Sequence, residues 1–399
     1  MKTVVAGPLQ GIKVLDFTRV YSGPYCTMLL ADLGAEIVKI EMPKNGDDTR
    51  HFLPFKNNES GYYMYLNRNK QGITLDLKND RGREIALDLA KWADVVVENY
   101  SPGTMKRLGL DYETIRKINP NVIYGSISGF GQTGPYRDRV AYDAVAQAMG
   151  GLMSVTGYPD HPPVKVGPSI ADANAGIHMA YALMAALYCR EKTGQGQYVD
   201  VSMMDTVFSI LENFVVQYTM TGIVPQRAGN ENLASAPFDA YPTIDDYVII
   251  ATANDNLFHK LVRVMEREDL ITDERFVTNL KRKQNYSQLK PLISGWTEKH
   301  TTEEVTELLV HARVPVAPIL TIDQLVDDPQ IKARDMLVEI DHPIAGKVTT
   351  PGIPVKFSET PGTIRTAAPM LGQHTDVVLT KILGLTPAEI AELRNAAVL

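Results

Sequence analysis

Asp172 is the residue whose sequence surroundings best fit covalent chemistry. It stands in Pro168-Ser-Ile-Ala-Asp172-Ala-Asn-Ala-Gly176, where one carboxylate enters a long apolar helix among small residues. One interpretation is structural, because an aspartate at a helix N-cap accepts hydrogen bonds from free backbone N–H groups. The other is catalytic: a helix N-terminus favours the ionised carboxylate by about 0.3–1 kcal/mol, and small neighbours leave room for a ligand. The two roles are compatible, and the second would make Asp172 a nucleophile.

A glycine motif at 129–134 invites a different interpretation. Gly129-Phe-Gly131-Gln-Thr-Gly134 fits GxGxxG and follows a strand-like run. A dinucleotide site requires the last glycine to open a helix, whereas Pro135 follows here at once. We therefore expect a flexible loop beside a ligand and no nicotinamide site.

Histidine and cysteine spacing gives no indication of a metal centre or of a disulfide. The eight histidines are scattered, and none pairs with another histidine or with a cysteine at ligand spacing. His178 lies six residues after Asp172, about 600° around a helix, so we interpret it as a packing residue. Cys26 and Cys189 are far apart, which fits a reducing compartment.

Composition limits the class of protein. A chain of 399 residues with 44% hydrophobic content should form two domains. A net charge of −7 argues against nucleic acid as the main partner, although a local basic pocket could still bind a small anion. No apolar run approaches the roughly 20 residues of a membrane span, and the N-terminus does not resemble a signal peptide. We expect a cytoplasmic protein that does not bind membranes.

The first half of the chain alternates β-branched runs with helical stretches, as in a βαβ series. The expected strands are 12–17, 36–41, 73–77, 94–98, 121–127 and 197–203, and the expected helices are 25–33, 81–92, 112–118, 142–150, 172–190 and 204–222. This pattern predicts a doubly wound, Rossmann-like α/β domain with both sheet faces covered.

The second half predicts a smaller α+β domain. Two short strands (FDAYPT and YVIIAT) precede helices at 255–266, 286–299 and 302–313; strands around 335–350 and helices at 373–383 and 386–397 follow. We expect a large domain over 1–203, a linker helix over 204–224, a small domain over 225–329, and a return to the large domain over 330–399.

Six segments in order resemble the class III CoA transferases, the CaiB/BaiF family of the formyl-CoA:oxalate and crotonobetainyl-CoA:carnitine type. They are 7–41, 67–78 (NRNKQGITLDLK), 97–113 (VENYSPGTMKRLGLDYE), 128–151, 193–205 (TGQGQYVDVSMMD) and 369–379 (PMLGQHTDVVL). The resemblance implies an enzyme that moves CoA from an acyl-CoA to a small carboxylic acid, with no permanently bound cofactor. It also places the family's catalytic aspartate on Asp172, which forms an anhydride and then an aspartyl-CoA thioester.

The same resemblance implies roles for further residues. The expected CoA contacts are Leu75, Lys78, Asn99, Tyr100, Ser101 and Arg107, with Lys39 or Lys44 in place of an arginine that is Met42 here. The expected acyl and acceptor pocket contains Tyr21, Ser22, Phe52, Tyr142 and Asp143. The family's glycine-rich loop corresponds to 228–236, which holds one glycine, so oxalate specificity is not implied. The resemblance further implies a homodimer of two interlocked chains.

Two rival functions remain. An α-methylacyl-CoA racemase of the same fold would place a histidine where this chain has Tyr142, and a tyrosine of ordinary pKa near 10 is a poor base at neutral pH. A CoA-binding protein without catalysis would not require both Asp172 and the CoA contacts.

Overall fold

The structure of the protein is a computed structural model that describes residues 7–399. Residues 1–6, part of the expected large domain, lie outside the described residues. The chain divides into two units. The larger comprises the chain up to Leu152, Lys165–Val216 and Pro329–Leu399, and the smaller comprises Met153–Val164 and Gln217–Asp328.

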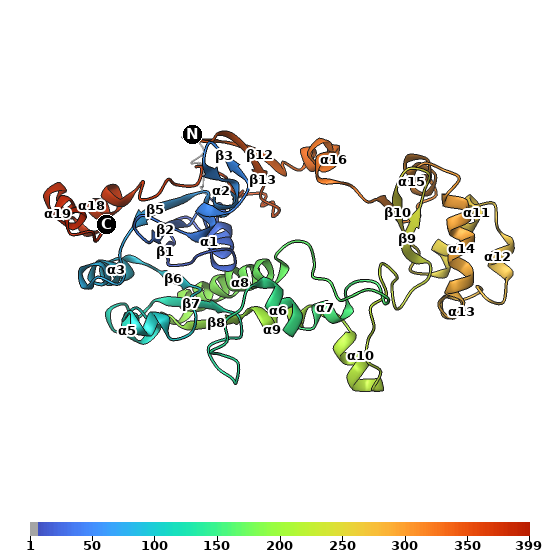
Figure 1. The fold of residues 1–399 in the computed structure, drawn as a ribbon, viewed down its shortest axis with the longest axis horizontal. Coiled ribbons are helices and arrows are strands. Elements are labelled where there is room, and N and C mark those ends of the chain that lie inside the picture. The colour runs from blue at the N-terminus through green and yellow to red at the C-terminus, as the bar shows by residue number, and fades with distance from the viewer. Residues whose placement is uncertain (1–6) are drawn as a thin grey trace. The chain divides into compact units, whose positions relative to one another are not determined.

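A six-stranded sheet organises the larger unit, in the order β5-β2-β1-β6-β7-β8 with every neighbouring pair parallel (Figure 1). Its strands are β1 (Lys13–Asp16), β2 (Glu36–Glu41), β5 (Lys70–Thr74), β6 (Val95–Glu98), β7 (Ile123–Ser128) and β8 (Tyr198–Ser202). The chain builds outward from β1 in one direction and then from β6 in the other. The strand order therefore reverses between β1 and β6, where doubly wound proteins bind ligands at the carboxyl ends of the strands.

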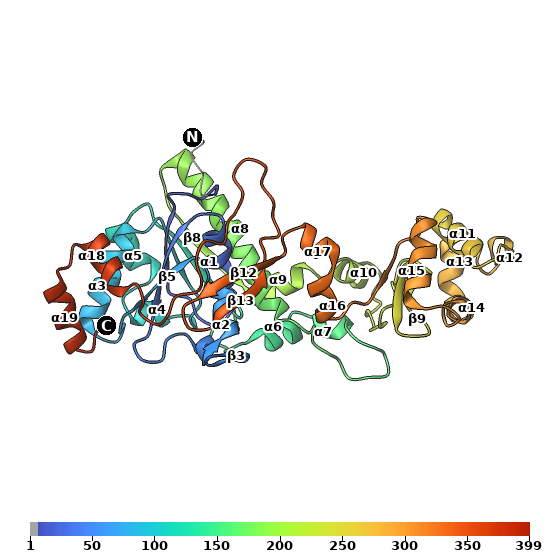
Figure 2. The same ribbon diagram turned by 90° about the horizontal axis from the view of Figure 1, so that it is seen from above.

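Alternate residues of these strands supply two separate apolar cores, one on each face. Val14 and Val95 join the core made with α1 (Ser22–Asp32) and α8 (Ile170–Thr193). Leu15 and Val96 join the core on the other face. The helices of that second face are α3 (Asp80–Trp92), α5 (Tyr112–Ile118), α18 (Thr375–Leu383) and α19 (Pro387–Asn395), and α18 lies beside α3 (Figure 2). The larger unit is thus the mixed α/β structure with a parallel sheet that the sequence predicts.

Short elements complete the larger unit. They are a 3-10 turn at Asp48–His51, β3 (Phe55–Lys56), β4 (Glu59–Ser60), α2 (Gly61–Asn67), α4 (Thr104–Arg107), α6 (Asp143–Met149), α7 (Leu152–Val155, which runs into the smaller unit), α9 (Met203–Ser209), α17 (Pro329–Ala333) and the hairpin β12 (Leu337–His342) and β13 (Gly346–Pro351). Residues 129–142 form turns and bends, so Gly134 opens no helix.

The smaller unit has an antiparallel sheet in the order β11-β10-β9 and its own apolar core. Its elements are β9 (Phe238–Pro242), β10 (Tyr247–Ala251), α11 (Asp255–Val264), α12 (Asp269–Thr272), α13 (Asn279–Gln284), α14 (Tyr286–Thr297), α15 (Thr302–His311), β11 (Val316–Pro318) and α16 (Ile322–Asp327). Arg282 is fully buried in this unit and donates to Asp255 (2.7 Å) and to the carbonyl of Ala236 (2.8 Å).

One predicted helix is wrong. The segment 204–222 was expected to be continuous, but it forms α9 and a separate α10 (Phe214–Thr221). Glu212, between them, has φ of +49°. This left-handed conformation cannot continue a right-handed helix, and apolar periodicity alone does not reveal such a break.

The crossing of α1 and α8 is unusually close at Gly176. A Cβ atom at this position would lie 2.7 Å from the carbonyl oxygen of Ser22 and 3.3 Å from the amide nitrogen of Cys26. Only a residue without a side chain lets the second turn of α8 rest on the first turn of α1. The contact fixes the distance between Ser22 and Asp172.

We predict that Gly176→Ala lowers the free energy of unfolding by about 1–3 kcal/mol, since the new methyl group meets backbone that cannot move aside. Gly167→Ala is the matched control: it adds a methyl group where no other atom lies within 4 Å, and its effect should stay within about 0.5 kcal/mol. Thermal and denaturant unfolding of both variants measure the difference. Equal free energies of unfolding for Gly176→Ala and Gly167→Ala would show that α1 and α8 can move apart without loss of stability.

Candidate active site

A cavity of about 250 Å³ opens where the strand order reverses, at the carboxyl ends of β1, β6 and β7. It gathers seven of the predicted site residues, namely Tyr21, Ser22, Asn99, Tyr100, Ser101, Tyr142 and Asp172. The β1–α1 loop, the loop after β6 and the start of α8 each contribute to its wall. Residues as far apart in the sequence as Arg19 and Met203 therefore line one space. We call it the Asp172 cavity.

Asp172 is not the N-cap of its helix, which corrects one of the two roles considered from the sequence. The helix α8 begins at Ile170, its N-cap is Ser169, and Asp172 belongs to its first turn. The side chain of Asp143 on α6 accepts the free N–H groups instead, from Ala171 (2.8 Å) and from Asp172 (3.3 Å). Gln147 donates to the other oxygen of Asp143 at 2.6 Å. Asp143 thus does the capping, and the carboxylate of Asp172 is free for another task.

The carboxylate of Asp172 faces the first residue of α1. The backbone N–H and the hydroxyl of Ser22 both act to stabilise its charged form, and Asn99 donates to the Ser22 hydroxyl oxygen at 3.3 Å. Burial first, and the charge of Asp143 second, raise the pKa of Asp172 to about 7, while the Ser22 hydrogen bonds act in the opposite direction. A carboxylate with this pKa is more basic than usual, yet it is still substantially ionised near neutral pH.

Asn99 holds the β1–α1 loop against the end of β6. Its side-chain oxygen accepts from the backbone N–H of Arg19 and its nitrogen donates to the carbonyl of Arg19, both at 2.8 Å. The backbone N–H of the next residue, Tyr100, donates to Glu98 at 2.8 Å. Asn99 was expected to contact CoA; its amide groups mainly order the loop that carries Tyr21 and Ser22.

Aromatic rings cluster beside the Asp172 cavity. The ring of Tyr21 lies 5.5 Å from that of Tyr25 and 6.0 Å from that of Tyr62, and Phe52 packs edge-on against Tyr62 at 5.7 Å. Burial, followed by the negative charge of Asp172, raises the pKa of Tyr62, whose hydroxyl forms a hydrogen bond with Ser169. Tyr62 was missed from the sequence, because nothing in the spacing of GYYMYLN distinguishes its three tyrosines. Phe52 does not line the cavity; it packs against Tyr62, which in turn packs against Tyr21 in the cavity wall.

A second cavity, of about 320 Å³, adjoins the first and shares Arg19 and Tyr100 with it. We call it the Lys78 cavity; Leu75 and Lys78 line it, and Lys78 is exposed. Arg107 lies outside this lining but donates to Thr104, which belongs to it, at 2.9 Å. Lys44 is exposed and lies outside both linings.

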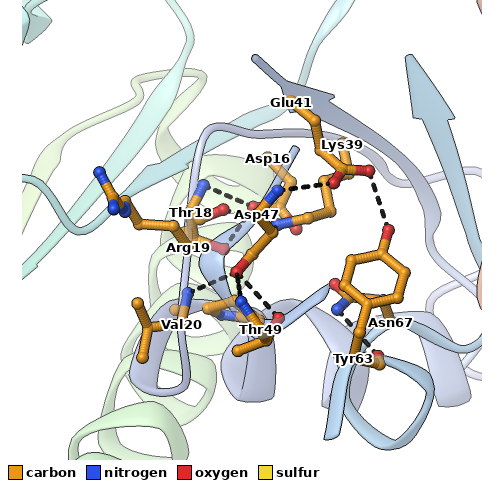
Figure 3. Close-up of polar contacts among 12 residues, drawn as sticks. Asp16, Thr18, Arg19, Val20, Lys39, Glu41, Asp47, Thr49, Tyr63 and Asn67 are labelled. Carbon is orange, nitrogen blue, oxygen red and sulfur yellow. Dashed lines mark hydrogen bonds and ion pairs between the residues drawn. The ribbon is translucent and has the colours of Figure 1, made fainter. Parts of the chain in front are cut away.

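Lys39, which was expected to contact CoA, belongs to the lining of the Lys78 cavity, but it differs from an exposed cation. Its side chain is fully buried; the ammonium donates to the carbonyl of Thr18 at 2.6 Å and pairs with Asp47 at 3.0 Å (Figure 3). The strand pattern EIVKIE explains the difference, because β2 is covered on both faces and its lysine has no solvent to reach. This ammonium is therefore already occupied by partners within the protein.

Residues 7–399 also bear on two other classes of feature, metal sites and membrane spans. No group of three or more histidine, cysteine, aspartate or glutamate side chains in this range could hold a metal ion. No helix in the same range combines the length and apolar character needed to cross a bilayer.

Sequence and structure comparisons identify the family. The sequence profile of CoA-transferase family III matches residues 9–375. Acetyl-CoA:oxalate CoA-transferase of Acetobacter aceti is 42% identical over 88% of this chain and 90% of its own, and human succinyl-CoA:glutarate CoA-transferase is 37% identical over 98% and 90%. The crystal structure of a CAIB/BAIF family protein from Brucella suis superposes with a TM-score of 0.86 at 36% identity, covering 94% of this chain and all of the other.

The predicted family and the predicted α/β fold with a parallel sheet are thus confirmed. A match over nearly the whole chain accompanies a parallel α/β sheet with its cavity at the point of strand reversal. The chain belongs to CoA-transferase family III and is an acyl-CoA transferase of that class.

Proposed function

We propose that the protein moves CoA from an acyl-CoA to a carboxylic acid with Asp172 as the nucleophile. The observation that carries the proposal is the division of labour at the start of α8, where Asp143 caps the helix and the Asp172 carboxylate meets only Ser22 at the edge of a cavity. A carboxylate that served only as a cap would bind the N–H groups that Asp143 binds here.

The transfer requires no proton and no additional reagent. An oxygen of Asp172 attacks the thioester carbonyl, the carbon–sulfur bond breaks, and CoA thiolate leaves behind a mixed anhydride. The thiolate then attacks the side-chain carbonyl carbon of Asp172, which releases the donor acid as a carboxylate and leaves an aspartyl-CoA thioester. The acceptor carboxylate repeats the two steps in reverse order. The N–H and hydroxyl of Ser22 are placed to stabilise the negative charge that forms on the oxygens of Asp172.

The two adjoining cavities suit an extended ligand such as CoA. We assign the thioester end to the Asp172 cavity and the nucleotide to the Lys78 cavity, with Leu75 and Lys78 along its wall. Tyr100 lines both cavities and Ser101 lines the Asp172 cavity, and Arg107 and Lys44 are exposed cations of the larger unit. Lys78 and Arg107 would attract the phosphates as exposed cations, despite the negative charge of the whole chain.

The acids are proposed to be short dicarboxylic acids. Relatives are named for oxalate, citramalate, glutarate and mesaconate. The Asp172 cavity contains Arg139, whose guanidinium stacks on the ring of Tyr136 at 3.9 Å and is exposed. Arginine binds a carboxylate through two parallel hydrogen bonds, so Arg139 could hold the carboxylate that does not react.

The protein is proposed to act as a homodimer with interlocked chains. The resemblance to the family implies this assembly, and α8 supports a partner of some kind. Ile177, Tyr181, Met184 and Tyr188 form an exposed stripe along one face of that helix, spaced four, three and four residues apart. An apolar stripe of this spacing is typical of a face that packs against another element.

The first test traps the acyl-enzyme. Incubation with a donor acyl-CoA followed by hydroxylamine should convert Asp172 to a hydroxamate, which peptide mass spectrometry would locate. Asp172→Asn should lose more than about 1,000-fold in transfer rate, because the amide keeps the shape but not the nucleophilic oxygen, and it should form no hydroxamate. Its unfolding midpoint should match that of the parent within a few degrees, since Asp143 still caps the helix. Parental activity in Asp172→Asn would reject the nucleophile, and hydroxamate at another residue would reassign it.

The second test uses pH. Because only the ionised form of Asp172 attacks, kcat/KM for the donor should fall as pH drops below about 7, the pKa of the free enzyme. Asp143→Asn removes the charge that helps raise this pKa and should move the acidic limb to lower pH, while the asparagine oxygen still caps Ala171 and Asp172. Gln147 must turn its amide over to accept, and circular dichroism would check that α8 persists. If the acidic limb of the Asp143→Asn profile stayed at the parental pH, the charge of Asp143 would not be a cause of the raised pKa of Asp172.

The third test concerns the acid. With one acyl-CoA donor, short dicarboxylic acids should be better acceptors than monocarboxylic acids of equal length. Arg139→Met should reduce kcat/KM for the dicarboxylic acids by about 10- to 100-fold, the loss typical of a hydrogen-bonded charge, and should leave the monocarboxylic acids nearly unchanged. Arg137→Met, two residues away and outside the Asp172 cavity, is the matched control. Equal losses for both kinds of acid would remove Arg139 from recognition of the second carboxylate.

A further inference from the structure

The loop between β1 and α1 holds a residue in a strained conformation. Val20 has φ of +66°, a left-handed value that is a genuine outlier for a β-branched residue. It lines the Asp172 cavity and comes two residues before Ser22. Strain of this kind costs about 1–3 kcal/mol and persists only where surrounding groups enforce it. The groups that enforce it therefore decide where the Ser22 donors point.

Three buried side chains bind the backbone of this loop (Figure 3). Asp47 accepts from the N–H of Val20 at 3.1 Å, and Lys39 donates to the carbonyl of Thr18 at 2.6 Å. Asp16, at the end of β1, accepts from the N–H of Thr18 at 2.8 Å. The backbone from Thr18 to Val20 is thus fixed by these three side chains and by Asn99, which binds Arg19.

Lys39 and Asp47 also bind each other, 3.0 Å apart and with almost no side-chain exposure. Burial by itself would lower the pKa of Lys39, but Asp47 and Asp16 hold it above its ordinary value; burial would raise the pKa of Asp47, but Lys39 and Thr49 hold it below. Both groups are therefore charged at neutral pH. A buried ion pair contributes little net stability, because desolvation offsets the attraction. Its presence here calls for another role, and the Thr18–Val20 backbone is what it contacts.

We propose that the Lys39–Asp47 pair positions the two Ser22 donors on Asp172 by holding Val20 in its left-handed conformation. Lys39 and Asp47 are then positioning residues for CoA transfer. The inference rests on the proposed role of Asp172 and adds the means by which its hydrogen-bond donors are kept in place.

The main experiment compares Lys39→Met with Arg68→Met. Arg68 forms an equally buried ion pair with Asp32, 2.7 Å long, at the opposite end of α1. Both substitutions leave one buried carboxylate unpaired, so both should lower the unfolding midpoint. Only Lys39→Met should reduce kcat, by about 10- to 100-fold, the cost of a misplacement near 1 Å, with KM for the acyl-CoA changed less than about threefold. A KM increase at constant kcat would instead make Lys39 a CoA contact and overturn the proposal.

A pH profile adds a readout that general destabilisation would not move. The Ser22 hydrogen bonds lower the pKa of Asp172, so their loss in Lys39→Met should shift the acidic limb of kcat/KM to higher pH. The other ionisable groups that face Asp172 are Asp143 and Tyr62, and the same cavity holds Arg19, Arg139, Tyr21, Tyr100 and Tyr142; none of them is altered. Arg68→Met should keep the parental limb. An unshifted limb in Lys39→Met, or an equal shift in Arg68→Met, would contradict the proposal.

A rescue experiment tests the strain itself. Glycine adopts positive φ without steric cost, so Val20→Gly in the Lys39→Met background should recover part of the lost kcat, measured against Val20→Gly alone. If Val20→Gly restored none of the lost kcat, Lys39 would not act by controlling the conformation of residue 20, and the proposal would be wrong. If Lys39→Met does not fold, Lys39→Met/Asp47→Asn removes both charges together and should show the same loss of kcat and the same shift of the limb; parental values there would overturn the proposal. Asp172→Asn in the same assays distinguishes failure of the proposed function from failure of this inference, because its activity tests only whether Asp172 is the nucleophile.

Discussion

The contact on which the site depends is the crossing of two helices near their N-termini, between the first turn of α1 and the first two turns of α8. Gly176 lets the backbones touch at Ser22, and this touch brings the Ser22 N–H to the Asp172 carboxylate. A free N–H at the start of a helix is the natural donor to an anion. The geometry belongs to the backbone, so it does not depend on flexible side chains finding each other. The rest of the larger unit can be understood as support for this crossing.

Three aspartates near that crossing show how surroundings assign different tasks to one side chain. Asp16 is fully buried, and although burial raises its pKa, Lys70 and Lys39 bring it below the ordinary value. Asp143 has both oxygens occupied by N–H donors. Asp172 is partly buried and no cation contributes to its pKa, which rises to about 7. The first orders a loop, the second caps a helix, and only the third combines a raised pKa with access to a cavity.

Much of this arrangement could be predicted from sequence, and the exceptions have a common cause. The β-branched runs predict β1, β2, β6 and β7 within about two residues, because a sheet covered on both faces demands such runs. Asp172 stands out because it is the only charged residue among the small residues at the start of a long helix. What sequence could not show depends on contacts between separate elements. Asp143 caps a helix that begins 27 residues later, and Lys39 pairs with Asp47 on the far side of a turn. Periodicity predicts on which face of a helix or strand a residue lies, but not which residue it contacts there.

Burial of Asp172 also bears on the direction of the proposed chemistry. In a mixed anhydride, CoA thiolate can attack either carbonyl, and the group expelled is the other carboxylate. Because burial disfavours a negative charge on Asp172, expulsion of the donor acid is the easier course in the proposed cycle, and it would give the aspartyl-CoA thioester. The last step of the cycle must nevertheless expel Asp172 itself. Its departure needs donors that stabilise the charge at that moment, and the Ser22 N–H and hydroxyl are the groups in place to do so. The site therefore has to meet two opposing requirements: a buried carboxylate that attacks well, and a pair of fixed donors that let the same carboxylate leave. The strained conformation of Val20 is the energetic cost of keeping those donors fixed.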